Sequence, residues 1–134
     1  MAKYFADSWY FIARIARGDA HHPTVLRIEA RLRGAWFVTH DAVLTEVLAY
    51  FSDEGAAMRT AAVRIVRDLL ETIEVVHSNR SLFLRALDLY EQRPDKEYSL
   101  VDCMSMIIMR ESGITHVLTN DHHFTQAGFV IVNQ

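Results

Sequence analysis

The sequence of 134 residues contains a single cysteine, Cys103, so no disulfide can form within the chain and a reducing compartment is expected. It has only two prolines and five glycines, which argues against a long linker or a disordered tail. No apolar run approaches the roughly 20 residues that cross a bilayer. A signal peptide is not expected either, because Asp7 and Arg14 interrupt any apolar core near the start. Together these absences predict a cytoplasmic protein.

Excess positive charge is also lacking. The 14 basic and 17 acidic side chains give a net charge of −3, which argues against binding nucleic acid through bulk positive charge. This balance still allows a nuclease in which a few local basic side chains border an acidic metal site. No G-x-G-x-x-G motif follows the first predicted strand, which argues against a dinucleotide-binding enzyme.

Short apolar segments alternate with amphipathic stretches along the chain. Aromatic and β-branched residues predict five strands, at Lys3–Ala6, Ala35–Thr39, Ile73–His77, His116–Thr119 and Phe129–Val132. Helical spacing of apolar residues predicts six helices, near residues 9–17, 24–32, 41–51, 56–71, 79–92 and 100–111. Ser8 and Ser78 are expected to cap two of these helices. The alternation predicts one α/β domain over residues 1–134, with a three-layer α/β/α architecture and a small, mostly parallel sheet.

Four carboxylates lie on or beside these apolar elements. Asp7 and Asp121 follow predicted strands, whereas Glu46 and Asp102 lie within predicted helices. In open parallel sheets, ligands bind at the carboxyl ends of the strands. Burying an unpaired charge is costly, and a bound divalent cation would offset several such charges at once. The pattern therefore predicts a metal site that activates water and stabilises charge on a phosphodiester.

Each acid also has an ordinary structural interpretation. Ser99 and Asp102 are spaced as a capping box, and the helix dipole favours an acid in the first turn. Asp7 and Asp121 could simply be turn residues. Glu46 is the hardest to explain in this way, because its neighbours in the helix are apolar. A phosphoacceptor signalling domain is disfavoured, because no lysine follows the fourth predicted strand. Considered jointly, the four acids favour the metal site.

The same positions carry a family resemblance. Asp7 and Thr45-Glu46 are followed by two later motifs, SLVDC at residues 99–103 and LTND at residues 118–121, and then by Phe124 and Gly128-Phe129. This arrangement resembles the PIN-domain ribonucleases over essentially the whole chain, and above all the VapC-type toxins of toxin–antitoxin pairs. The resemblance implies an endoribonuclease that uses Mg²⁺ or Mn²⁺ to cleave RNA, forms a homodimer and is inhibited by a small antitoxin protein.

The resemblance also implies roles for individual residues. The acidic cluster that carries catalysis and holds the metal would consist of Asp7, Glu46, Asp102 and Asp121, with Ser8 and Thr119 as polar neighbours. Many relatives carry a further acid two residues after the position of Asp121, where this chain has His123. That departure leaves the second metal position open. It also motivates an alternative function, a catalytically silent PIN-like module that binds RNA or a protein.

Basic and imidazole side chains are candidates for contact with substrate. Arg14 and Arg17 are the best candidates for an RNA-facing rim, since their helix begins next to Asp7. His122 or His123 could contact a phosphate near the acids. Neither the pair His21-His22 nor the pair His122-His123 has Cys or His partners at zinc-site spacing, which disfavours zinc. The substrate-binding candidates are therefore Ser8, Arg14, Arg17, Thr119 and His123.

Overall fold

A computed structural model describes residues 2–134, which form five strands and seven helices. The strands are β1 (Lys3–Ala6), β2 (Trp36–His40), β3 (Glu74–Val76), β4 (His116–Leu118) and β5 (Val130–Ile131). The helices are α1 (Ser8–Ile15), α2 (His22–Arg31), α3 (Asp41–Tyr50), α4 (Ala56–Thr72), α5 (Arg80–Gln92), α6 (Leu100–Glu111) and α7 (His123–Gln126). The predicted order of elements is confirmed, with one addition: the short helix α7 lies where only a turn was expected.

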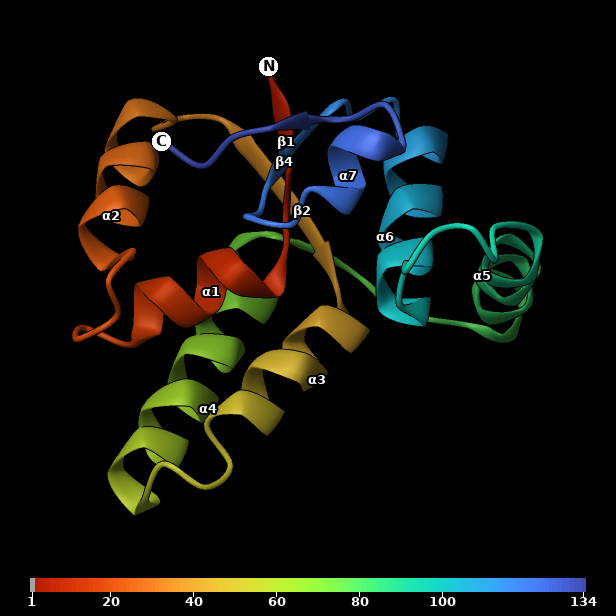
Figure 1. The fold of residues 1–134 in the computed structure, drawn as a ribbon. Helices are drawn as coiled ribbons and strands as arrows, with labels where there is room; N and C mark the ends of the chain where they lie inside the picture. The colour runs from red at the N-terminus through yellow and green to blue at the C-terminus, as the bar shows by residue number, and fades with distance from the viewer. Residues whose placement is uncertain (1) are drawn as a thin grey trace.

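The sheet is parallel throughout, with the strand order β3-β2-β1-β4-β5. Strand β1 lies at the centre of the sheet. Strands β2 and β3 follow on one side of it, and strands β4 and β5, which come later in the chain, lie on the other side. Helices cover both faces in a three-layer α/β/α arrangement; Figure 1 shows α2 and α6 on opposite sides of the strands, with α5 outside α6. Because the strand order reverses beside β1, a crevice is expected at the carboxyl ends of β1 and β4.

Helix α6 is fixed at both of its ends. At its start the predicted capping box is confirmed: the Asp102 N–H donates to the Ser99 hydroxyl (3.0 Å), and the Ser99 N–H donates to the Asp102 carboxylate (3.1 Å). At its end Gly113 has a φ of +68°, and the Ile114 N–H donates to the Met109 carbonyl at 2.8 Å. This turn connects the end of α6 directly to the start of β4.

Two predicted caps are wrong. Helix α1 has Asp7 at its N-cap, and Ser8 is already its first helical residue. Helix α5 is capped by Asn79, whose side-chain oxygen accepts from the Leu82 N–H at 2.8 Å. Ser78 instead donates its N–H and its hydroxyl to Asp41, which joins the end of β3 to the start of α3. Serine and asparagine are comparable caps, so the tertiary contact with Asp41 decides which one is used.

No helix within residues 2–134 is both long enough and apolar enough to span a membrane.

Candidate active site

Asp7 lies at the carboxyl end of the central strand β1. Its backbone N–H donates to the Leu118 carbonyl at 3.1 Å, which continues the pairing of β1 with β4 beyond the strand. Its side chain is only 6% exposed. Burial raises the pKa of Asp7 to about 6, although hydrogen bonds from the Thr119 hydroxyl and the Ser8 backbone partly offset this shift. A buried carboxyl group whose pKa is shifted this far marks a candidate functional site.

Thr119 connects Asp7 with Asp121. Its buried hydroxyl donates to the Asp7 carboxylate at 2.7 Å and accepts from the Asp121 N–H at 3.2 Å. The Asp121 carboxylate in turn accepts from the His123 N–H at 3.0 Å, a local turn that begins α7. One hydroxyl therefore fixes an acid that follows β1 relative to an acid that follows β4.

Asp102 and Glu46 reach the same region from helices α6 and α3. Burial raises the pKa of Asp102, while the capping hydrogen bonds with Ser99 lower it and the charge of Asp121 raises it further. Burial also raises the pKa of Glu46 to about 7, followed by repulsion from Asp7 and Asp102. Asp7, Asp121 and these two acids line the same cavity, so the fold gathers them into one cluster.

The cluster lines a cavity of about 450 Å³. The lining residues are Asp7, Ser8, Trp9, Ile12, Glu46, Glu97, Ser99, Asp102, Thr119, Asn120, Asp121 and His123. Five of them are acids, and none is lysine or arginine. All four acids of the predicted cluster are present, together with Ser8, Thr119 and His123 from the predicted substrate-binding set.

The donor set fits a divalent cation. Carboxylate oxygens are the ligands that Mg²⁺ and Mn²⁺ prefer, and one or two per ion often suffice when water completes the shell. The pKa of Asp7, Glu46 and Asp102 is raised in each case, so the acids lack the positive charge that would stabilise their ionised forms. A cation in the cavity would supply that charge.

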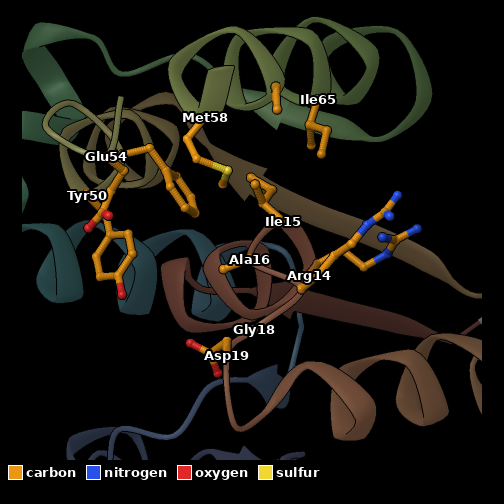
Figure 2. A pocket seen from close by; sticks show the side chains of 12 residues that line it. Arg14, Ile15, Ala16, Gly18, Asp19, Tyr50, Glu54, Met58 and Ile65 are labelled. Atoms are coloured by element: carbon orange, nitrogen blue, oxygen red, sulfur yellow. The ribbon is translucent and has the colours of Figure 1, made fainter. Parts of the chain in front are cut away.

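Two predicted residues lie elsewhere. Arg14 and Arg17 line a different cavity, of about 730 Å³, together with apolar residues from α3 and α4 (Figure 2). The Arg14 guanidinium forms an ion pair with Glu29 at 3.0 Å. Helix α1 rises about 1.5 Å per residue, so its far end at Ile15 lies about 12 Å from Asp7. A role for these arginines in substrate binding stays a prediction.

Sequence reasoning missed Glu97, Ser99, Asn120 and Trp9 as residues that line the acidic cavity. Glu97 precedes α6 in a polar loop, where an acid carries no pattern that separates it from a solvated surface charge. The sequence predicts Ser99 as a cap and as part of the SLVDC motif, but not as a residue that lines the cavity. Its position beside Asp102 could have indicated that it lines the cavity, because a cap lies within one turn of the residue it contacts.

The chain is similar to known proteins over nearly its whole length. The model of the PIN domain matches residues 4–130. The chain is 31% identical over 131 residues to the 23S rRNA-specific endonuclease VapC20 of Mycobacterium tuberculosis, in strains CDC 1551 and H37Rv, and the alignment covers 96% of both proteins.

Solved structures give the same result. The crystal structure of M. tuberculosis VapC20, described as a sarcin–ricin loop cleaving toxin, matches with a TM-score of 0.86 and 30% identity, over 98% of this chain and 99% of that chain. A domain of a functionally unknown protein from Methanocaldococcus jannaschii matches with a TM-score of 0.56 and 20% identity, over 100% of this chain and 91% of that chain. The second likeness supports the fold alone.

Proposed function

Because this chain belongs to the PIN-domain family, we propose that it is a metal-dependent endoribonuclease and the toxin of a toxin–antitoxin pair. The observation that carries the proposal is the acidic cavity at the carboxyl ends of β1 and β4. The likeness to VapC20 makes 23S rRNA the first substrate to test and implies a small antitoxin protein as partner. A ribosomal substrate would in turn imply a cytoplasmic location.

In the proposed reaction an RNA phosphodiester is hydrolysed at the acidic cavity. A bound Mg²⁺ or Mn²⁺ would supply activation of the attacking water and neutralisation of charge on the phosphate. Asp7, Asp102 and Asp121 would hold it, with Glu46 completing the cluster. The Thr119 hydroxyl orients the Asp7 carboxylate, and such supporting contacts govern how well a ligand binds. The raised pKa of Glu46 suits a group that takes up a proton near neutral pH.

The test is cleavage of an RNA mixture that contains 23S rRNA by the purified protein, freed of any antitoxin. We expect cleavage with Mg²⁺ or Mn²⁺ and none with EDTA, because the carboxylates alone cannot neutralise the phosphate. Cleavage that persists in EDTA would contradict metal dependence. Tight RNA binding that EDTA does not affect, without cleavage in any metal, would favour the alternative of a silent binding module.

A homodimer is also part of the proposal, and an apolar face of α5 supports it. Phe83, Leu84, Leu87 and Tyr90 are 44–53% exposed, although large apolar side chains are normally covered when they cluster. Within residues 2–134, α5 packs chiefly on α6, which leaves this face open to solvent. A two-fold axis would let the same face of a second copy cover it.

The charges at the two ends of this face fit an antiparallel pair of α5 helices. Exposed Arg80 and Glu91 lie 11 residues apart, which is about three helical turns, so both border the same face. Antiparallel packing centred between Leu84 and Leu87 brings Arg80 of each copy beside Glu91 of the other. The face is therefore complementary to itself in charge.

We expect Arg80→Glu and Glu91→Arg each to weaken the dimer by about tenfold, because two exposed ion pairs per dimer become repulsive. The double variant should restore the affinity, since it re-forms both pairs with the signs exchanged. Sedimentation equilibrium gives the dissociation constants. Leu87→Glu should yield monomers, whereas Leu70→Glu, at a similarly exposed position on α4, should not. A double variant no tighter than the single ones would exclude this packing.

A further inference from the structure

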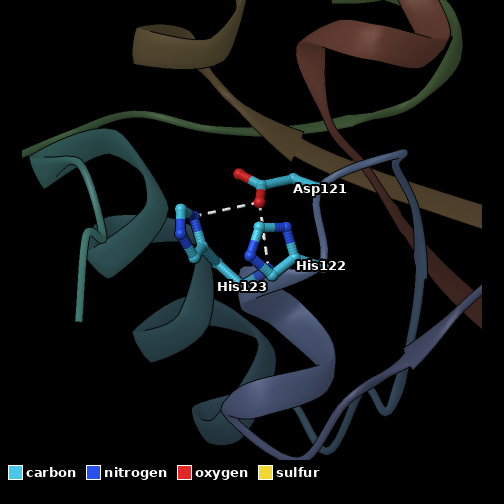
Figure 3. A group of neighbouring side chains, drawn as sticks. All are labelled: Asp121, His122 and His123. Carbon is cyan, nitrogen blue, oxygen red and sulfur yellow. Dashed lines mark hydrogen bonds and ion pairs between the residues drawn. The ribbon is translucent and has the colours of Figure 1, made fainter.

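A second group of possible metal ligands lies at the edge of the acidic cavity, where the chain enters α7. Figure 3 shows the side chains of Asp121, His122 and His123 together. A carboxylate oxygen of Asp121 and one ring nitrogen from each histidine all lie within 4.8 Å of one another. Three successive residues thus place one oxygen and two nitrogen atoms close enough together for the group to hold one metal ion.

The contact between His123 and Asp121 is unusual for a simple ion pair. His123 Nδ1 lies 3.0 Å from Asp121 Oδ1, and the histidine side chain is only 16% exposed. Nδ1 is nevertheless buried without a hydrogen-bond partner, because the two atoms are not aligned for a hydrogen bond. The same carboxylate oxygen already accepts the His123 backbone N–H, at 3.0 Å. Nδ1 therefore lies beside a carboxylate oxygen without a hydrogen bond between the two atoms.

The 3.0 Å spacing of these two atoms fits two ligands of a single ion. Nitrogen and oxygen ligands bind a divalent transition metal at about 2.1 Å, and two such ligands at right angles lie about 3.0 Å apart. The ring of His123 is held in place by Tyr98, whose ring meets it edge-on at 5.7 Å, and the His122 ring lies 4.5 Å from that of His123. The cluster is thus partly ordered before an ion binds.

We propose that Asp121, His122 and His123 form a second metal position that takes a first-row transition-metal ion such as Co²⁺, Ni²⁺ or Zn²⁺ in preference to Mg²⁺. Imidazole nitrogen suits these ions, whereas Mg²⁺ prefers oxygen ligands throughout. The proposal rests on the proposed function in that Asp121 is shared with the acidic cluster. This set does not match the spacing of Cys and His ligands in structural zinc sites, because its third ligand is the neighbouring aspartate.

The test is a titration of the metal-free protein with Co²⁺ alone, followed by its visible absorption, which reports nitrogen and oxygen ligands directly. We expect saturable binding that Mg²⁺ in large excess does not displace. Replacing residues that only support metal ligands costs 10–100-fold in affinity, so the variant His122→Ala/His123→Ala should lose at least about tenfold. The matched control is His21→Ala/His22→Ala, which removes the other adjacent pair of histidines, and this variant should bind Co²⁺ as the unaltered chain does.

Cleavage of RNA in Mg²⁺ by the same variants separates this proposal from the proposed function. Co²⁺ affinity that is unchanged in His122→Ala/His123→Ala would overturn the second metal position, whether or not RNA is cleaved. Loss of Co²⁺ affinity in this variant alone would support the position even if no RNA were cleaved in any metal, an outcome that would overturn only the nuclease. Thermal melting of each variant without metal verifies that it is folded.

Discussion

Replacing Asp7 with asparagine should abolish metal-supported RNA cleavage and, at pH 8 without metal, make the protein more stable. We expect the cleavage rate to fall at least about 100-fold, because the variant loses a central ligand for the ion that stabilises the transition state. Asparagine has the same shape and can still accept from the Thr119 hydroxyl, so the fold should be kept. Activity and stability would then change in opposite directions at one residue.

The gain in stability follows from the pKa of Asp7, which rises from 3.8 to about 6 on folding, chiefly through burial. Above pH 6 the folded protein holds a buried charge that the unfolded chain exposes to water, and a difference of this size corresponds to up to about 3 kcal/mol. Asparagine removes that cost. Near pH 4 the wild-type carboxyl is protonated in the folded state, so the advantage of the variant should disappear.

Denaturant unfolding at pH 4 and pH 8 measures the expected change in stability, and RNA cleavage in Mg²⁺ measures the expected loss of activity. Asp68→Asn is the matched control, because Asp68 is an exposed aspartate on α4, and it should change neither quantity appreciably. An Asp7→Asn variant that cleaves RNA at the wild-type rate would remove Asp7 from the site. A variant that is less stable at pH 8 would show that the Thr119 contact outweighs the charge.

Divalent cations should raise the melting temperature strongly at pH 8 and hardly at all at pH 5. The pKa of Asp7 is about 6 and that of Glu46 about 7, both above their ordinary values of 3.8 and 4.5. These groups therefore favour the folded state fully below about pH 4, and this contribution is lost as the pH rises through 6 to 7. At pH 8 both are ionised, and a cation supplies the charge that they lack.

At a concentration 100 times the dissociation constant, Mn²⁺ or Mg²⁺ should stabilise the protein by about 2.7 kcal/mol, or about 10 °C in melting temperature. At pH 5 protons occupy the same carboxylates, so the ion must displace them and its effect shrinks. Calorimetric melts with and without metal at both pH values measure this difference. Asp102→Asn should reduce the shift at pH 8; an equal shift at pH 5 and pH 8 would place the bound metal outside the acidic cluster.

Much of the fold could be predicted because local pattern and tertiary structure agree. Apolar strands alternate with amphipathic helices, and the capping box at Ser99 and the glycine at position 113 delimit α6 in the sequence as they do in space. Asp102 had two competing interpretations, as a cap and as a site residue. The structure shows the cap and places Asp102 in the cavity as well, since a carboxylate has two oxygens and the cap uses one.

The features that could not be predicted depend on distances in space, which cannot be read from the order of the residues. Arg14 follows Asp7 closely along the chain, yet the helix between them carries it to another cavity. Glu97 lines the acidic cavity from the loop before α6, and a loop path has no periodic signal in the sequence. The short helix α7 contains only four residues, too few for helical spacing to be recognised.

The hydrogen bond from Thr119 to Asp7 joins residues 112 positions apart, which has a consequence for the timing of biosynthesis. A ribosome adds about 5–20 residues per second, so roughly 6–20 s separate the two ends of this contact during translation. Strand β1 can pair with β2 long before β4 exists, but the acidic cluster closes only when β4 is added. A nuclease of this fold therefore gains its activity only when nearly all of the chain has been synthesised. A partner protein that recognises earlier segments has time to bind before that point.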